Sequence, residues 1–405
     1  MPAVPRAATQ RILIVSQHPY PEMPTLHRNV AELLARGVSV DLVCLTWGPS
    51  PLPPGLRVYP IRIKPRRSHA MWYPIHYLAF FAWALLAVSI LSVRRRYDAV
   101  QVDTLPDFLI FTTLLPRLRG TRIVLYVMEL MPELTMTRLR VGKEAPLVRL
   151  AARLERAATS WATRVIAVST TVSRILVGRG LDASHVAVVP NSHPVGEFPP
   201  RQHPAQPPFL VLQTTLIERY GVAVAIRALA LLHEEWPELT LHVIGDGEER
   251  PNLLRLAEQL GLAHHVIMSA TFLPWHETME RVRRATLGIV PILADGYGEL
   301  CLSNKILEFA ALEVPAVCSR LRGFEEHFPD DAVAYFTPGD ASGLATQARR
   351  LLRDPEEARQ QAQRARLAFA NLAWEPAAGV YLDTLGLTPD AVTRSHSISG
   401  AARAV

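Results

Sequence analysis

The chain has 405 residues, nearly half of them apolar, so it can bury the cores of two domains of ordinary size. Its net charge of +6 favours an acidic partner such as a nucleotide, a phosphate-bearing lipid or an anionic membrane surface. Its three cysteines are far apart, which argues against a disulfide framework or a structural zinc site and indicates a reducing compartment. The first ten residues contain no apolar signal-peptide core, so we expect a cytoplasmic protein.

Short apolar runs alternate with amphipathic segments along the first half of the chain. Such runs predict buried strands, and the segments between them predict the helices of parallel-sheet α/β units. The predicted strands are RILIV from Arg11, VDLVCL from Val40, AVQV from Ala99, RIVLYV from Arg122, RVIAV from Arg164 and VAVV from Val186. The predicted helices are Thr25 to Arg36, Asp107 to Leu118, Leu147 to Trp161 and Thr170 to Gly180.

One uncharged run, Tyr77 to Val93, needs separate treatment. Its length is at the lower limit for a membrane span, but a span would cut the first α/β unit in two. We therefore predict an apolar helix that packs on the sheet or lies at an interface. The basic residues around it either bind an anionic lipid surface or form an ordinary solvated face. They are Lys64, Arg66, Arg67, Arg94, Arg95 and Arg96.

The proline-rich stretch from Pro194 to Pro208 has the composition of a linker. The α/β alternation restarts after it, with predicted strands FLVLQ from Phe209, LTLHVIG from Leu239, HVIMS from His265, LGIVPI from Leu287 and VPAVCS from Val314. We therefore predict an α/β protein of two lobes, residues 1–200 and 201–372. A helix at 373–387 should pack back on the first lobe, and the polar tail 388–405 is predicted to be disordered.

Three strand-to-helix junctions in the second lobe carry candidate ligand-binding residues, because ligands bind beyond the carboxyl ends of parallel strands. They are Thr214 to Gly221, Gly245 to Glu248, and Asp295 to Leu312. The glycines of the second junction would allow a ligand to approach the backbone closely. Taken alone, a Gly-x-Gly is more often a tight turn, and a Lys-x-x-Glu pair is usually a solvated helix face. Three such junctions in one lobe indicate a shared site.

The third junction carries the most specific chemistry. Leu302 or Ser303 should cap a helix whose free amides favour phosphate, and Lys305 adds a point charge there. Glu308, one turn further along, can accept hydrogen bonds from two vicinal hydroxyls, such as those of a ribose. The junction therefore predicts a nucleotide site.

With these motifs the chain resembles the family 4 (group 1) retaining glycosyltransferases with the two-lobed B-type fold, from Ile12 to about Leu387. The residues that carry the resemblance are Met131-Pro132-Glu133, Val188-Val189-Pro190-Asn191-Ser192, Gly245-Asp246-Gly247 and Ser303-Asn304-Lys305-Ile306-Leu307-Glu308-Phe309. Among them, Glu308 matches the second glutamate of the family's Glu-x7-Glu motif, which binds the nucleotide ribose.

The resemblance implies two Rossmann-like lobes whose parallel sheets face a central cleft, with the acceptor in the first lobe and the donor in the second. It implies transfer from a nucleoside diphosphate sugar to a saccharide or lipid-linked acceptor, with retention of configuration. Neither a metal nor another cofactor is implied, and no covalent enzyme nucleophile; the leaving phosphate assists attack on its own face. No nucleic-acid partner is expected. Membrane contact would place the protein at the inner face of the plasma membrane.

The resemblance also implies site residues. Two carboxylates of the first lobe are expected near the donor sugar as catalytic residues, Glu129 and Glu133. The expected donor-binding residues are Thr215, Arg219, Gly245, Gly247, Glu299, Ser303, Asn304, Lys305 and Glu308.

The sequence departs from the family's pattern at Met128, Thr215, Tyr220 and Leu300, where the family has histidine, arginine, lysine and glutamate. The two lost cations matter most, because departure of a diphosphate without a metal builds negative charge that the protein must stabilise. Arg219 and Lys305 are expected to supply that charge instead.

Alternatives stay open. An epimerase or a phosphorylase can use the same two-lobed fold, although a phosphorylase would need a cofactor lysine and the chain offers only Lys64, Lys143 and Lys305. A catalytically inactive relative could bind nucleotide sugars and act as a partner protein. A nicotinamide-dependent dehydrogenase is disfavoured, because no Gly-x-Gly-x-x-Gly follows the first strand.

Overall fold

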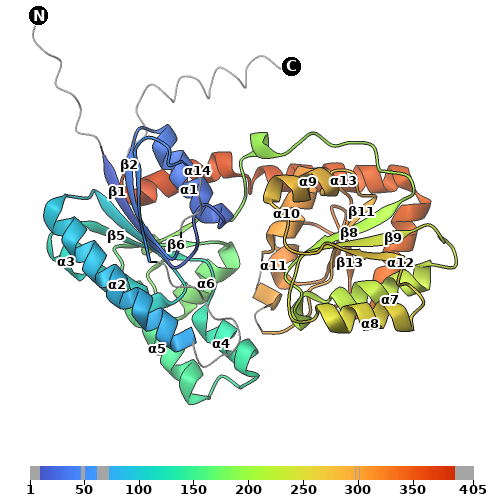
Figure 1. The fold of residues 1–405 in the computed structure, drawn as a ribbon, viewed down its shortest axis with the longest axis horizontal. Helices are drawn as coiled ribbons and strands as arrows, with labels where there is room; N and C mark the ends of the chain where they lie inside the picture. The colour runs from blue at the N-terminus through green and yellow to red at the C-terminus, as the bar shows by residue number, and fades with distance from the viewer. Residues whose placement is uncertain (1–9, 47–50, 62–72, 297, 301, 388–405) are drawn as a thin grey trace, which may run out of the picture. The chain divides into compact units, whose positions relative to one another are not determined.

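The computed structural model describes residues 10–46, 51–61, 73–296, 298–300 and 302–387, which form two compact units (Figure 1). Unit 1 comprises Met1–His193 and Glu375–Val405, and unit 2 comprises Pro194–Trp374. The division after His193 lies seven residues before the predicted boundary at 200, and the division after Trp374 lies two residues after the predicted boundary at 372. Lys64, Arg66, Arg67, Cys301 and the predicted tail lie outside the described residues.

Unit 1 is built on a seven-stranded sheet in the order β3-β2-β1-β4-β5-β6-β7, with every paired strand parallel. Its inner strands are apolar on both faces, as Ile12, Leu13, Ile14 and Val15 of β1 illustrate, because helices cover both sides. The strands are β1 (Arg11–Ser16), β2 (Ser39–Cys44), β3 (Leu56–Pro60), β4 (Ala99–Asp103), β5 (Arg122–Val127), β6 (Arg164–Ala167) and β7 (Val186–Val188).

The helices of unit 1 lie in two layers. Helices α2, α3 and α5 gather on one side of the sheet, and α1 and α14 lie on the other (Figure 1). On the second side, the Tyr381 hydroxyl of α14 donates to Gln101 Oε1 of β4 over 2.7 Å. The elements are α1 (Pro24–Ala35), α2 (Tyr73–Arg94), η2 (Asp107–Thr113), α3 (Leu114–Leu118), α4 (Met131–Leu139), α5 (Pro146–Trp161), α6 (Thr170–Gly178), η3 (Ala183–His185) and α14 (Trp374–Leu385).

Unit 2 is built on a six-stranded sheet in the order β10-β9-β8-β11-β12-β13, again with parallel pairing. The strands are β8 (Phe209–Gln213), β9 (Thr240–Ile244), β10 (Val266–Met268), β11 (Leu287–Val290), β12 (Ala316–Ser319) and β13 (Ala334–Phe336). In both sheets the order reverses beside the first strand, between β1 and β4 in unit 1 and between β8 and β11 in unit 2. Such a switch point is where open α/β sheets bind ligands.

Two apolar layers sandwich the unit 2 sheet, one beneath α9, α10 and α13 and the other beneath α7, α8 and α12 (Figure 1). Leu229 of α7 and Phe309 of α10 are fully buried representatives of the two layers. The elements are η4 (Val195–Glu197), η5 (Glu218–Tyr220), α7 (Val222–Leu232), α8 (Arg250–Gln259), α9 (Trp275–Val282), η6 (Gly298–Leu300), α10 (Asn304–Ala311), α11 (Arg322–Glu325), α12 (Ala341–Arg353) and α13 (Pro355–Ala370).

All predicted strands are confirmed to within two residues, but the prediction from the sequence was wrong about two strands and one helix. It missed two short edge strands, β3 and β13; Arg57 interrupts the apolar run of β3, whereas the apolar run from Ala332 to Phe336 could have indicated β13. It predicted one helix over Asp107 to Leu118, where the first half is the 3-10 helix η2. The proline-rich stretch follows the change from unit 1 to unit 2, as its composition indicated, and it is anchored on unit 2, because the Arg201 guanidinium donates to the carbonyls of Arg283 and Ala285 over 2.7 and 2.9 Å.

The apolar segment from Tyr77 to Val93 is indeed helical and belongs to α2. Among the described residues, Ile75–Arg94 is the one helical stretch that is long and apolar enough to cross a membrane. Its Phe80, Ala84 and Val88 side chains are fully buried against unit 1. The helix is therefore packed on the protein along one face.

Candidate functional site

The predicted donor residues gather at the switch point of the unit 2 sheet. Thr214 to Gly221 follows β8, Asp295 to Leu312 follows β11, and Gly245 to Glu248 follows β9 on the neighbouring side. These loops are joined by backbone hydrogen bonds: the amide of Leu293 donates to the carbonyl of Arg219, and the amide of Leu216 donates to the carbonyl of Asp246. The structure therefore brings the three predicted junctions to one edge.

Arg219 and Lys305, the two predicted cations, are fixed at this edge by specific partners. Arg219 Nε lies 2.7 Å from Asp295 Oδ2, and its side chain is only 12% exposed. The Lys305 ammonium stands 4.6 Å from the ring centre of Tyr220, a cation–π contact with the residue that follows Arg219. The Arg219 guanidinium is therefore largely buried in an ion pair.

The amino end of α10 is built as expected for an anion-binding helix start. Ser303 is the N-cap, and its hydroxyl accepts a hydrogen bond from the amide of Lys305, so the predicted cap is confirmed. Asn304 and Lys305 form the first turn and are partly exposed. Glu299 is exposed on η6, and Thr215 is exposed in the loop after β8.

Glu308 is buried one turn into α10, with 8% of its surface exposed. Its two carboxylate oxygens accept hydrogen bonds from Gln213 Nε2 at 3.0 Å and from Trp275 Nε1 at 3.1 Å. Each oxygen retains a further lone pair that can accept another hydrogen bond. Gln213 and Trp275 thus orient the carboxylate at the end of β8 without using up its capacity to accept hydrogen bonds.

The glycines of the second junction have a structural role of their own, beside the ligand contact predicted for them. Gly245 has a φ of +153°, and a Cβ there would stand 1.8 Å from the carbonyl oxygen of Thr214. A Cβ at Gly247 would stand 2.4 Å from the carbonyl oxygen of Leu216. These glycines are therefore required because the loop after β9 packs directly on the loop after β8, whatever ligand binds there.

The two predicted catalytic carboxylates of unit 1 differ in their surroundings. Glu129 is partly exposed just beyond the end of β5. Glu133, in the first turn of α4, is 7% exposed and forms an ion pair with Arg179, which also pairs with Glu155 at 2.6 Å. Burial raises the pKa of Glu155. The ion-pair network joins α4, α5 and the end of α6, so Glu133 is tied into the framework of the unit.

A polar cluster that the sequence reading missed lies at the switch point of the unit 1 sheet. Asp103 is the last residue of β4 and is 1% exposed. Gln101 Nε2 donates to Asp103 Oδ1 over 2.7 Å, whereas Asp103 Oδ2 has no hydrogen-bond partner. Burial raises the pKa of Asp103, against the opposing effects of Gln101, Ser16 and His18. Ser16 and His18 come from the end of β1, so the cluster lies where a ligand of this unit would bind.

The sequence offered signals for some of the missed residues and none for others. Gln213 and Asp103 are polar residues that close buried strands, a pattern that could have identified both. Asp295 opens the segment already chosen for its lysine and glutamate. Trp275, by contrast, begins α9 and reaches Glu308 only through the packing of α9 beside α10, which no local pattern predicts.

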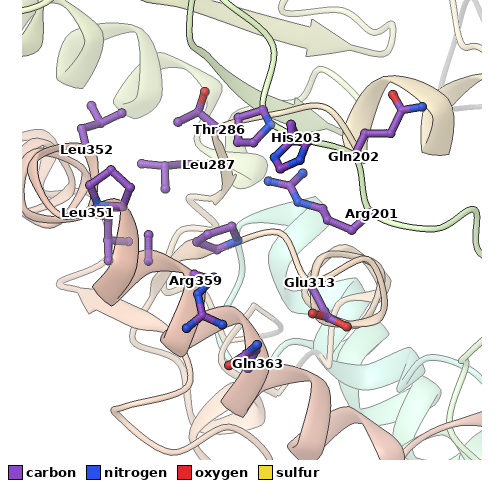
Figure 2. A pocket seen from close by; sticks show the side chains of 14 residues that line it. Arg201, Gln202, His203, Thr286, Leu287, Glu313, Leu351, Leu352, Arg359 and Gln363 are labelled. Carbon is purple, nitrogen blue, oxygen red and sulfur yellow. The ribbon is translucent and has the colours of Figure 1, made fainter.

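A cavity of about 620 Å³ in unit 2 is not part of this site (Figure 2). It is lined by Leu287, which begins β11, by Pro315, which precedes β12, and by Leu351 of α12. The lining residues therefore lie at the amino ends of the strands, opposite the edge that carries Arg219 and Lys305. Burial lowers the pKa of Arg201, which projects beside this cavity, to about 10.

Two family models match the chain, one for each unit. The model described as glycosyl transferase 4-like domain matches residues 24–192, and the model described as glycosyl transferases group 1 matches residues 197–368. The division between the two matches falls in the proline-rich stretch where unit 1 gives way to unit 2.

Curated relatives match part of the chain. A GDP-mannose-dependent alpha-(1-6)-phosphatidylinositol monomannoside mannosyltransferase of Mycolicibacterium smegmatis is 31% identical over 37% of this chain and 40% of its own length. A lipopolysaccharide core biosynthesis glycosyltransferase, LpsE, of Rhizobium meliloti is 31% identical over 37% of this chain and 41% of its own length. The chain thus spans about two fifths of the length of these relatives.

Solved structures share the fold over nearly the whole chain. Sucrose-phosphate synthase from Thermosynechococcus elongatus has a TM-score of 0.74 at 17% identity, covering 94% of this chain and 100% of that one. Anabaena Alr3699/HepE in complex with UDP and glucose has a TM-score of 0.68 at 16% identity, with coverage of 94% and 100%.

Proposed function

The chain belongs to the group 1 glycosyltransferases with the two-lobed B-type fold, and we propose that it transfers a sugar from a nucleoside diphosphate sugar, with retention of configuration and without a metal ion. The acceptor that we propose is a saccharide or a lipid-linked saccharide. The donor binds at the switch point of unit 2, and the acceptor binds at the carboxyl edge of the unit 1 sheet.

The observation that carries this proposal is the pair of fixed cations at the switch point of unit 2. Lys305 stands over the ring of Tyr220, the residue that occupies the place of the family's lysine. The Lys305 ammonium therefore lies close to the position that the ammonium of the family's lysine would occupy. In this chain the positive charge comes from α10 instead of from the loop after β8. Arg219 precedes Tyr220 and is held by Asp295. A diphosphate leaving group needs such preorganised positive charge.

Two further features fit a nucleotide in this site. The amides at the start of α10, where Ser303 caps the helix, can donate to phosphate oxygens. The Glu308 carboxylate, held by Gln213 and Trp275, can accept hydrogen bonds from the two ribose hydroxyls. The phosphates would thus lie at the helix start and the ribose one turn further along.

The chemical step that we propose is a front-face exchange at the anomeric carbon. The bond from that carbon to the phosphate oxygen breaks, and the acceptor oxygen forms its bond from the same face, so configuration is retained. The acceptor proton passes to the leaving phosphate oxygen. In this proposal the residues of the protein act by orientation and charge: Arg219 and Lys305 stabilise the diphosphate, and Glu129 is the residue of unit 1 that we expect to hydrogen-bond the donor sugar. Glu133 positions α4 through its pair with Arg179.

A thermal-shift screen of the full chain against UDP, GDP, ADP and TDP tests the donor site. A ligand that binds the folded state raises its stability by RT ln(1 + [L]/Kd), so one nucleotide should raise the unfolding midpoint more than the other three. GDP and UDP come first, because a relative is named for GDP-mannose and a structural neighbour contains UDP. A turnover assay with the corresponding nucleotide sugars follows. Stabilisation by no nucleotide would overturn the donor site; binding without any turnover would favour an inactive partner protein.

A further inference from the structure

The outer face of α2 is apolar although it is exposed. Its large exposed side chains are Ile75, Leu78, Trp83, Leu86, Ile90 and Val93, and only 33% of its most apolar stretch is buried. They recur every three to five residues, so they lie on one side of the helix, opposite the buried Phe80, Ala84 and Val88. From Ile75 to Val93 this stripe is roughly 27 Å long at 1.5 Å per residue.

This stripe differs from the usual surface of a soluble helix. Leu78 is 61% exposed, Leu86 is 54% exposed and Val93 is 63% exposed, yet α2 contains no acidic or lysine side chain and ends on one arginine. Isolated exposed leucines need no explanation, but a contiguous apolar face of this length marks an interaction surface.

The end of the stripe is basic. Arg94 and Arg96 are exposed at the carboxyl end of α2. Helix α3 adds two exposed leucines, Leu114 and Leu118, and it is tied to this end because the Arg119 guanidinium donates to the carbonyl of Ser92.

Two side chains near the basic end are already engaged within the protein. Arg95 is not available, because its guanidinium is bonded to both carboxylate oxygens of Asp41. The one exposed carboxylate that follows these arginines, Asp98, accepts a hydrogen bond from the amide of Arg11.

We propose that the outer face of α2 docks on an anionic phospholipid bilayer, with the apolar stripe in the interface and Arg94 and Arg96 on lipid phosphates. Charge complementarity selects this occupant: lipid phosphates would pair with Arg94 and Arg96, whereas the α2 face of a second copy of the chain offers them no acidic side chain. The buried inner face keeps the helix on unit 1, so α2 lies along the interface and does not span it. Trp83, half-exposed within the stripe, belongs at the headgroup level.

The inference uses none of the donor-site residues, so its failure and the failure of the proposed function are distinguishable. Co-sedimentation of the full chain with vesicles of phosphatidylcholine alone, and of phosphatidylcholine mixed equally with phosphatidylglycerol, tests it without any substrate. We expect binding to the mixed vesicles that weakens at least tenfold between 50 mM and 500 mM salt, as the ionic attraction is screened.

Two variants separate the apolar and the ionic parts. Leu86→Glu should weaken binding to the mixed vesicles at least tenfold, whereas Leu367→Glu, at a leucine 72% exposed on α13, should leave it unchanged. The double variant Arg94→Gln/Arg96→Gln should lose roughly 25-fold, about fivefold for each charge. Circular dichroism and the unfolding midpoint check that each variant is folded.

Quenching of tryptophan fluorescence by brominated lipid tests whether one residue, Trp83, contacts the bilayer. Tryptophan emission should be quenched on the mixed vesicles, and the Trp83→Phe variant should lose most of that quenching while still binding. Three results would each overturn the proposal: no binding to either vesicle, equal binding by Leu86→Glu and the parent, or a dimer without lipid that Leu86→Glu converts to a monomer. The last would assign the stripe to a second copy of the chain.

Discussion

The sheet of unit 1 reverses its strand order between β1 and β4, and the sheet of unit 2 reverses between β8 and β11. The topology is the same, but the polar groups at the two edges differ. Unit 1 buries carboxyl groups there, such as Asp103, with an oxygen that has no partner. Unit 2 places cations at its edge: Arg219 forms an ion pair with Asp295, and Lys305 stands over the ring of Tyr220.

Because of this difference, we expect the two edges to bind different kinds of ligand. A fixed, partly exposed cation can meet a diphosphate without a costly rearrangement, which suits the edge of unit 2 to the charged end of a nucleotide sugar. A buried carboxyl group tends to remain neutral, because burial disfavours its ionised form. We therefore expect the edge of unit 1 to meet uncharged hydroxyl groups, and the following predictions break or sharpen this comparison.

The largest effect is expected at Glu308. Glu308→Ala should weaken nucleotide binding by about 1.5–3 kcal/mol, the range for hydrogen bonds to a charged group, because the ribose loses its acceptor. Isothermal titration calorimetry measures the change. Glu308→Gln keeps an acceptor oxygen for Trp275, so its nucleotide affinity should lie between those of Glu308→Ala and the parent. Glu277→Ala, exposed on α9, is the matched control. Parental affinity in a folded Glu308→Ala protein would remove the ribose role.

The two cations come next. Arg219→Ala and Lys305→Ala should each lower kcat/KM at least tenfold, about 1.4 kcal/mol of transition-state stabilisation. If both side chains hold the same diphosphate, the double variant should lose less than the sum of the two losses. Binding of the sugar nucleotide should also suffer more than binding of the nucleoside.

Lys143→Ala, an exposed lysine of unit 1, controls for the loss of a lysine charge elsewhere. Parental turnover in both single variants would mean that these cations do not stabilise the leaving group. The contrast between the two edges would then have no catalytic meaning.

A smaller effect is expected from Asp107 of unit 1. Burial, with a further contribution from Glu155, raises its pKa to about 8, and its Oδ2 has no partner. In the unfolded chain the same carboxyl group ionises near pH 4. The native state then holds a proton that the unfolded state has lost, so this group makes stability fall as pH rises from about 4 to 8.

Asp107→Asn removes this titration. The variant should therefore be more stable than the parent by about 1 kcal/mol or more at pH 8 and should differ little at pH 4, measured by urea unfolding. Asp182→Asn is the control of opposite sign, because hydrogen bonds from Ser184 lower the pKa of Asp182, and its contribution is lost as pH falls. An Asp107→Asn curve parallel to the parent's would show that the carboxyl group does not titrate in this range.

The unequal success of the sequence reading has a physical reason. Apolar runs report burial directly, so the inner strands of both sheets were predicted to within two residues, whereas the partly exposed edge strand β3, interrupted by Arg57, carries little such signal. The cap at Ser303 and the loop cations were predictable because they depend on residues close together in the chain. The contact of Trp275 with Glu308, and that of Tyr381 with Gln101, depend on how distant helices pack, and only the fold supplies that.

The least effect is expected from chelation: turnover should be unchanged in EDTA and should not rise with Mg²⁺ or Mn²⁺. The reason lies in the same contrast between the two edges. A metal at the diphosphate would stabilise the charge that develops on departure, and the edge of unit 2 already carries Arg219, Lys305 and the amides of α10 for that task. Within the described ranges, no three side chains among His, Cys, Asp and Glu gather as metal ligands. The measurement is a turnover assay with and without EDTA, on protein prepared in a chelator. A known magnesium-dependent transferase serves as the positive control. If EDTA abolishes turnover and Mg²⁺ or Mn²⁺ restores it, the two cations are insufficient, and the leaving group departs with a metal bound.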